Sequence, residues 1–236
     1  QLQETGVWES AAEAPGSEPA RMMASILIVK VVNINTAIEL LHPTTLGSLL
    51  KEYLFYLKQA ARIHDGELRR INGDSVMLTF PESRCGDQHS INALRCAGLF
   101  QALMTKINQR HRDRGEQVLD FRMAIHNGDV YLAPGIASED APGILGKTID
   151  IAYFLSKQVR PNQLVISESA FSRAREYEDI EPSGQQDVSM PADNVSFMAY
   201  SLSEDFGTRL HQVNRHCARI LGEASHLKAV SPTDAR

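Results

Sequence analysis

The sequence has few cysteines, few aromatic residues and no excess of positive charge, and each of these shortages excludes a class of protein. Its three cysteines form no Cys-x-x-Cys pair, and an odd number of thiols cannot close a disulfide framework, so a reducing compartment is expected. Aromatic residues make up only 6% of the chain, which predicts a mainly aliphatic core. The formal net charge of −5 argues against a nucleic-acid partner, because binding to phosphates needs clustered Lys and Arg.

The sequence also lacks a long apolar run. None approaches the roughly 18 residues that cross a bilayer, and the strongest, residues 26–32, is interrupted by Lys30. The first residues are acidic and rich in Ala and Pro, unlike a signal peptide. With 43% hydrophobic and 22% charged residues, the composition is that of an ordinary globular domain. The sequence therefore predicts a cytoplasmic protein with no membrane segment in this part of the chain.

Apolar periodicity divides the chain into three parts. Residues 1–22 have no apolar period and are predicted to be a disordered tail or linker, residues 23–203 to be one domain, and residues 204–236 to be a C-terminal helical extension and tail. Alternation predicts strands and a period of three to four predicts helices. The expected strands are residues 25–32, 67–71, 76–80, 119–126, 129–132, 163–167 and 196–202, and the expected helices are about 44–64, 94–116, 148–158 and 205–228.

Local signals add turns and helix starts to this pattern. Asn72-Gly73 and Asn127-Gly128 each lie between strand-like runs and are predicted to be hairpin turns. The Thr44-Thr45 pair is a good N-cap for the first long helix. The order of strands and helices predicts an α+β fold, a ferredoxin-like α/β sandwich with helices packed on one face of a mainly antiparallel sheet.

Four segments, in this order, resemble the catalytic domain of the class III adenylyl and guanylyl cyclases. They are residues 71–80 (INGDSVMLTF), 122–130 (RMAIHNGDV), 144–152 (ILGKTIDIA) and 161–168 (PNQLVISE). The resemblance covers residues 24–202. It implies a sandwich of the nucleotide cyclase type, closure of a nucleoside triphosphate to its 3′,5′-cyclic monophosphate, and a head-to-tail dimer whose sites straddle the interface.

The metal-binding pair that the resemblance implies is altered. The family's hairpin aspartate corresponds to Asp74, but its first-strand aspartate corresponds to Lys30. Mg²⁺ prefers hard oxygen ligands, and an ammonium about 4 Å away repels a cation by about 4 kcal/mol at an effective dielectric of 20, which weakens binding roughly a thousandfold. Asp74 is therefore predicted to be a single, vacant metal ligand. We also expect Lys30 Nζ within ~4 Å of an Asp74 oxygen, so that the lysine replaces the metal.

The nucleotide-binding positions that the resemblance implies are altered as well. The base-reading lysine corresponds to Arg70, and Lys147 is the local candidate where a base-selecting aspartate is expected. The helix asparagine and arginine correspond to Asp150 and Phe154. Loss of one preorganised donor to a charged transition state costs about 10²–10³ in rate, so no residue is assigned a catalytic role. Arg70, Lys147 and Asp150 are kept as predicted nucleotide-binding residues.

The sequence is thus interpreted as a class III cyclase-like domain, catalytically degenerate, that serves as a regulatory or nucleotide-binding module. The alternative is an active adenylate or guanylate cyclase with unusual site residues. No resident cofactor is expected, and Mg²⁺ or Mn²⁺ enters only if activity remains. The expected partners are a nucleoside triphosphate and a second copy or a related cyclase domain, docked through the apolar helix around residues 146–158.

Simpler interpretations of the same residues stay open. Asp74 can serve only to stabilise its turn, and Lys30 can be a charge that protects an edge strand. His126 is interpreted as a structural histidine, and no zinc site is expected from the histidine spacing. The basic cluster of residues 110–114 is interpreted as a solvated helix end. A diguanylate cyclase relative and an RNA-binding sheet fit less well, because the Gly-Gly-Asp/Glu-Glu-Phe turn and paired strand aromatics are missing.

Overall fold

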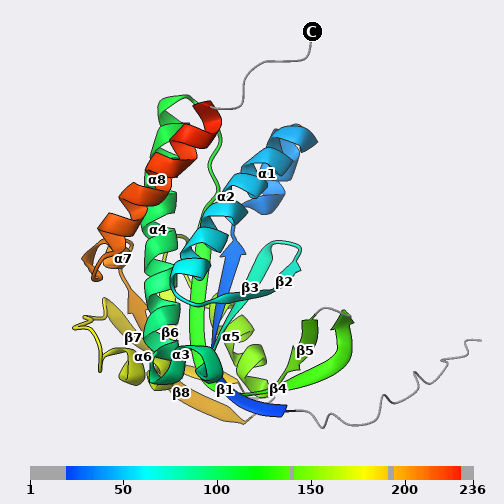
Figure 1. The fold of residues 1–236 in the computed structure, drawn as a ribbon, viewed down its shortest axis with the longest axis vertical. Coiled ribbons are helices and arrows are strands. Elements are labelled where there is room, and N and C mark those ends of the chain that lie inside the picture. Colours follow the sequence, from blue (N-terminus) through cyan, green and yellow to red (C-terminus); the bar gives the residue numbers. More distant parts are fainter. Residues whose placement is uncertain (1–19, 139–140, 191–193, 230–236) are drawn as a thin grey trace, which may run out of the picture.

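A single mixed sheet forms the centre of the protein, as the computed structural model in Figure 1 shows. Residues 20–138, 141–190 and 194–229 are described. The sheet has the order β2-β3-β1-β4-β6-β8-β7, with β5 paired to β4. Its strands are β1 (Ala20–Val31), β2 (Glu67–Asn72), β3 (Ser75–Pro81), β4 (Phe121–Ser138), β5 (Ala141–Leu145), β6 (Leu164–Ser167), β7 (Gly184–Met190) and β8 (Val195–Leu202). The helices are α1 (Ile34–Leu40), α2 (Pro43–Ile63), α3 (Glu82–Cys85), α4 (His89–Asp113), α5 (Lys147–Lys157), α6 (Glu168–Ala174), α7 (Phe206–Arg209) and α8 (Val213–Ala229).

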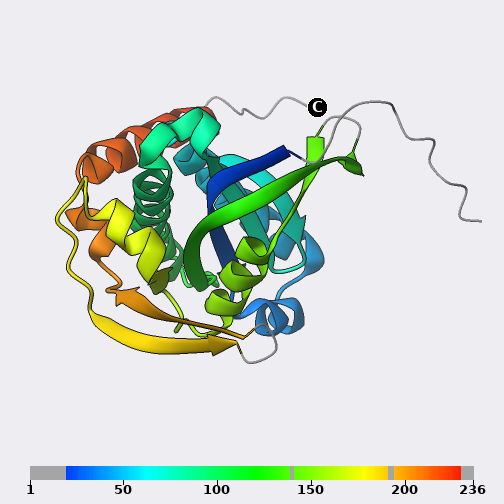
Figure 2. The same ribbon diagram turned by 90° about the horizontal axis from the view of Figure 1, so that it is seen from below.

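The central strand β1 is apolar on both of its faces. Leu27, Val29 and Val31 pack into the large cluster that α2, α4 and α8 share, whereas Ile26 and Ile28 pack into a second cluster under α5. Successive side chains of a strand point to opposite faces, so both faces of the sheet need a cover. The α+β fold of the predicted type is confirmed, but the expectation of helices on one face is wrong, because α5 lies on the face opposite α4 (Figure 2).

The turn predicted at Asn127-Gly128 is wrong. β4 continues through this pair, and Gly128 lies opposite Ala24 of β1 in an antiparallel ladder. A Cβ on Gly128 would lie 2.6 Å from Thr148 Oγ1, so the glycine lets the start of α5 pack closely on the strand. The glycine thus serves close packing in the interior of a strand rather than a turn.

Of the other two local predictions, the turn at Asn72-Gly73 is confirmed and the N-cap at Thr44-Thr45 is wrong. Asn72-Gly73 does form the hairpin turn between β2 and β3, with Gly73 in the left-handed region at φ 58°. The first long helix, however, begins at Pro43 and is capped by His42, whose ring nitrogen accepts a hydrogen bond from the Thr44 amide. The Thr44-Thr45 cap is therefore wrong by two residues. Proline is favoured in the first turn because its missing N–H would have no helical partner there.

The C-terminal region is helical, but the single helix predicted over about 205–228 is divided into α7 and α8, with Leu210 between them. α8 begins at Val213 and buries Cys217, Ile220 and Leu221 against the cluster around α4. Whether this region is a separate extension of residues 204–236 remains a prediction. Among the described residues, no helix combines the length and the hydropathy that a membrane span needs.

Candidate functional site

The candidate site is built around an ion pair at the end of β1. Lys30 Nζ lies 3.0 Å from Asp74 Oδ2, and the Asp74 carbonyl accepts a hydrogen bond of 2.7 Å from the Val31 amide. The strand register places Lys30 opposite Ser75, so the hairpin turn is held against the end of β1. The predicted Lys30–Asp74 contact is confirmed.

The exposure of this pair decides how much it stabilises the fold. The two side chains are 31% and 30% exposed, so water screens the pair. We expect Lys30→Ala to lower the free energy of unfolding by only about 0.2–1 kcal/mol, the usual range for wet pairs. Urea unfolding at low and high salt, in a double-mutant cycle with Asp74→Ala, measures this. A loss near 3 kcal/mol, the size seen when a buried pair is broken, would contradict it.

Arg122 adds a second cation beside this pair. It lies directly opposite Lys30 on β4, so both side chains stand on the α5 side of the sheet. Arg122 Nε is buried and has no hydrogen-bond partner, and no carboxylate in the described part of the chain forms an ion pair with Arg122. Two cations therefore meet one carboxylate, which leaves the site with an excess of positive charge. The sequence places Arg122 within a motif, but only the register shows that it faces Lys30.

These residues do not fit a pair of divalent cations. Two-metal catalysis needs carboxylates that bridge both ions, and Asp74, the carboxylate that the described residues place in an ion pair with Lys30, is already engaged. Within the described ranges, no group of three or more His, Cys, Asp or Glu side chains is arranged to hold a metal ion. The local charge favours an anion.

Arg70 is the third basic residue on this face. It lies opposite Met77 of β3, which lies opposite Ile28 of β1, two residues before Lys30. Residues in such a row share a face of the sheet. The Arg70 side chain is exposed, at the edge strand β2. We call Arg70, Lys30 and Arg122 the basic row.

The other two predicted nucleotide-binding residues lie far from the basic row. Lys147 and Asp150 are exposed in the first turn of α5, whose start is fixed by a 2.6 Å hydrogen bond from Thr148 Oγ1 to the Asp129 carbonyl. Asp129 lies seven residues from Arg122 along β4, roughly 23 Å at about 3.3 Å per residue. One chain therefore does not bring the predicted nucleotide-binding residues together.

Phe154 and His126 are packed into the protein. Phe154 is half-buried against the cluster that includes Val165 and Ala199, where it offers no hydrogen-bond donor. His126 Nδ1 lies 2.8 Å from Ser167 Oγ, and burial lowers the pKa of His126 to about 4, so the ring is neutral at pH 7. This environment fits the structural role predicted for His126.

The interpretation of residues 110–114 as a solvated helix end is wrong for His111. Its side chain is only 14% exposed and lies between two carboxylates, Glu52 of α2 and Glu116 of the loop after α4. No local pattern predicts this contact, because Glu52 is 59 residues away from His111 in the chain.

No protein-family model matches the sequence, and no curated protein matches it. Solved structures do match. The adenylyl cyclase CyaB from P. aeruginosa has a TM-score of 0.71 at 19% identity, covering 79% of this chain and 96% of that one. The guanylate cyclase domain of RhGC from Catenaria anguillulae, in complex with GTP, has a TM-score of 0.61 at 11% identity, covering 78% and 98%. A non-canonical dimeric guanylyl cyclase domain of the RhoGC fusion protein from the aquatic fungus Blastocladiella emersonii has a TM-score of 0.63 at 12% identity, covering 78% and 97%.

At these identities the likeness establishes the fold. The chain has the fold of the class III nucleotide cyclase catalytic domains, which the four sequence segments predicted.

Proposed function

We propose that this domain is a catalytically inactive nucleotide cyclase-like module that binds a nucleoside triphosphate with basic side chains in place of metal ions. The observation that carries the proposal is the basic row, in which Lys30 is paired with Asp74 at 3.0 Å and Arg122 stands beside it with no ion-pair partner among the described residues. Guanidinium and ammonium groups are the usual partners of phosphate oxygens, and Arg122 has donors to spare.

The loss of cyclase activity follows from the same residues. Closure of the ring needs the attacking and leaving oxygens to be held by two metal ions, and Lys30 occupies the position of one ligand. Phe154 cannot donate to a charged transition state, and Asp150 adds a negative charge where a neutral amide is expected. The module thus keeps the means to hold phosphates without the means to cleave them.

We propose further that the complete site needs two chains, as a homodimer or with a related cyclase domain. Roughly 23 Å of strand separates Arg122 from Asp129, to which the start of α5 is bonded, so Lys147 and Asp150 must come from a second chain to meet a nucleotide bound at the basic row. The exposed pair Tyr131 and Leu145, opposite one another on β4 and β5, offers apolar surface for such contact.

Calorimetric titration with ATP and with GTP in EDTA tests the proposal. We expect saturable binding without a divalent cation, and excess Mg²⁺ should weaken it, because the ion neutralises the phosphates that the basic row attracts. Arg122→Ala should weaken binding about 10–100-fold, because it removes about one hydrogen bond between charged groups. Lys58→Ala, which removes an exposed cation from α2, is the control and should leave affinity unchanged.

Two results would contradict the proposal. Strictly Mg²⁺-dependent binding would mean that Lys30 does not replace the metal. Formation of cyclic nucleotide from ATP or GTP with Mn²⁺ at a rate near about 1 s⁻¹, within the ordinary enzyme range, would establish the alternative of an active cyclase. Sedimentation of the same samples tests assembly, and a monomer that binds nucleotide fully would rule out the shared site.

A further inference from the structure

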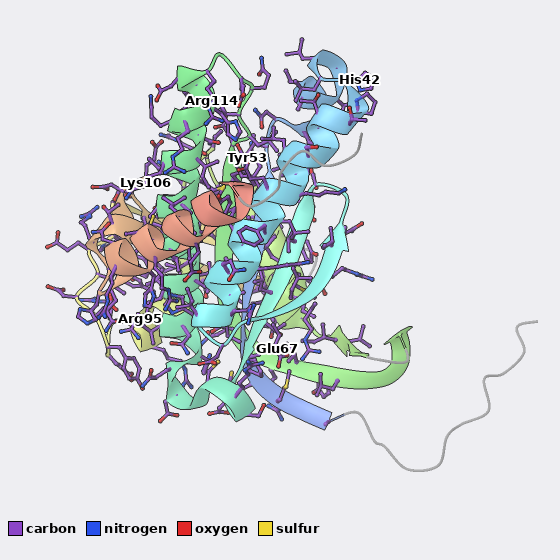
Figure 3. The ribbon with its side chains drawn as sticks, turned by 45° about the horizontal axis from the view of Figure 1, so that its top comes forward. His42, Tyr53, Glu67, Arg95, Lys106 and Arg114 are labelled. Atoms are coloured by element: carbon purple, nitrogen blue, oxygen red, sulfur yellow. The ribbon has the colours of Figure 1, made fainter. Side chains whose placement is uncertain are left out.

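A large cavity lies on the other side of the sheet from the basic row. It has a volume of about 570 Å³ and lies between α2, the end of α4 and α8. Figure 3 shows this region, with α8 running toward α2 and Tyr53 labelled between α2 and α4. The walls of the cavity are mainly apolar, and its volume falls in the range of about 300–1,000 Å³ that is usual for small-molecule sites. The apolar wall consists of Leu41, Leu49, Phe55, Tyr56 and Ala224.

The polar part of the cavity is a cluster of three side chains that links α2 to the end of α4. His111 Nε2 lies 3.1 Å from Glu52 Oε2, and His111 Nδ1 lies 2.5 Å from Glu116 Oε2. Two carboxylates and one imidazole carry a net negative charge whether the ring is neutral or protonated. The cavity lining includes no Lys or Arg among the described residues. Its electrostatic complement is a cation.

The geometry of the cluster decides between a metal ion and an organic cation. The two carboxylates bind opposite nitrogens of the same ring, so their oxygens do not converge on one point, and the described residues contain no metal-binding group. An organic cation needs no such convergence, because its N–H donors and its apolar body reach separate parts of the wall. Arg110 and Arg114 line an adjoining cavity of about 240 Å³ that shares Glu52, Tyr56, His111 and Ala224 with this one, so an organic anion would be drawn there, whereas Glu116 lines the larger cavity alone and favours a cation.

We propose that the cavity between α2, α4 and α8 is a second binding site, which takes a small organic cation in which an amine is carried on an apolar body. The amine donates to one of the two carboxylates while the other adds negative charge to the lining, and the body packs against Leu49, Phe55 and Tyr56. This site is separate from the basic row, which lies on the other face of the sheet and attracts anions instead.

A matched series of probes tests the charge preference on the unmodified chain. 4-Phenylbutylamine, 4-phenylbutanol and 4-phenylbutyrate share one apolar body and differ in charge. We expect the amine to bind saturably in calorimetry and to raise the melting temperature, with an affinity about tenfold or more above that of the alcohol, as charge-assisted hydrogen bonds provide. Equal binding of amine and alcohol, tighter binding of the carboxylate, or no saturable amine binding at about 1 mM, where a millimolar site is half filled, would overturn the proposal.

Variants then place the amine in the cavity. Glu52→Gln and Glu116→Gln keep the shape of the lining and remove one charge each, so each should weaken amine binding about tenfold while alcohol binding stays unchanged. Glu39→Gln on α1, which is exposed and outside the cavity, is the control. If the control lowers amine affinity as much as the two cavity variants, the amine is bound by general surface charge and the site is refuted. Nucleotide titrations on the same variants should be unchanged, so this result is independent of the proposed function.

Discussion

Replacing Lys30 by aspartate should convert the ion pair into a divalent-cation site. In the unmodified protein, Mn²⁺ is expected to leave the melting temperature unchanged. In Lys30→Asp, Mn²⁺ should raise the melting temperature, and at 100 times its dissociation constant it should add about 2.7 kcal/mol to the free energy of unfolding. Without Mn²⁺ the variant should be less stable than the unmodified chain, because two carboxylates then face one another. The expected gain in metal affinity is about a thousandfold, since about 4 kcal/mol of repulsion is removed and a ligand is added.

The reason lies in the position of the two side chains. Lys30 Nζ and Asp74 Oδ2 are 3.0 Å apart, so both side chains already converge on one point. Carboxylate oxygens at such a point are the ligands that Mg²⁺ and Mn²⁺ prefer. In the Lys30→Asp variant, nucleotide binding should therefore become dependent on Mg²⁺ or Mn²⁺. Phe154 and Asp150 remain, so cyclase activity is not expected to return.

A second ion pair on the same strand provides the control. Arg21 pairs with Asp129, and these side chains are 64% and 40% exposed. Arg21→Asp makes the same exchange of charge, but in water and without a hairpin turn to hold the ligands, so it should gain little metal affinity. If both variants bind Mn²⁺ equally, the gain reflects added negative charge alone. If Lys30→Asp binds no Mn²⁺, the lysine does not occupy a metal position.

The sequence predicted the fold because its strongest signals coincide with the buried centre of the sheet. β1, β3 and β6 are short apolar runs next to clear turns, and the four cyclase-like segments include two of them. β7 was not predicted, since Gln185, Gln186 and Asp187 give it no apolar alternation. It lies at the edge of the sheet, where polar side chains cost little because one side of the strand faces solvent.

The site was predictable only where the resemblance to the cyclase family supplied the contact. Lys30 and Asp74 stand at the two positions whose aspartates share metal ions in that family, so their contact could be predicted before the pairing of β1 with β3 was known. Arg122 required the pairing of β1 with β4, which spans more than ninety residues of chain. The contact between His111 and Glu52 depends on how α2 packs on α4, and no local pattern records that packing.

The C-terminal helices depend on a close crossing that a single methyl group should break. Gly207 of α7 packs directly on Gly98 of α4, and a Cβ on Gly207 would lie 2.1 Å from the Gly98 carbonyl oxygen. That neighbour is backbone in the middle of a long helix and cannot move aside. We expect Gly207→Ala to lower the free energy of unfolding by about 3 kcal/mol, the upper part of the usual range for overpacking.

The first part of the fold to loosen should be α7 with α8. Cys217 of α8 is fully buried, and burial raises the pKa of its thiol, so it should react slowly with a thiol reagent in the unmodified protein. In Gly207→Ala it should react quickly. Because Ala224 of α8 lines the cavity between α2, α4 and α8, the variant should also lose affinity for 4-phenylbutylamine while nucleotide binding at the basic row persists.

The same methyl group placed elsewhere in this region should act in the opposite direction. Gly222 of α8 is exposed, and a Cβ there meets nothing within 4 Å. Gly222→Ala should therefore raise the free energy of unfolding by about 0.5–1 kcal/mol, because alanine is the better helix former. Urea unfolding and Cys217 reactivity of the two variants measure the difference. If Gly207→Ala is as stable as Gly222→Ala, the crossing of α7 on α4 is not tight and α8 is held by its side chains alone.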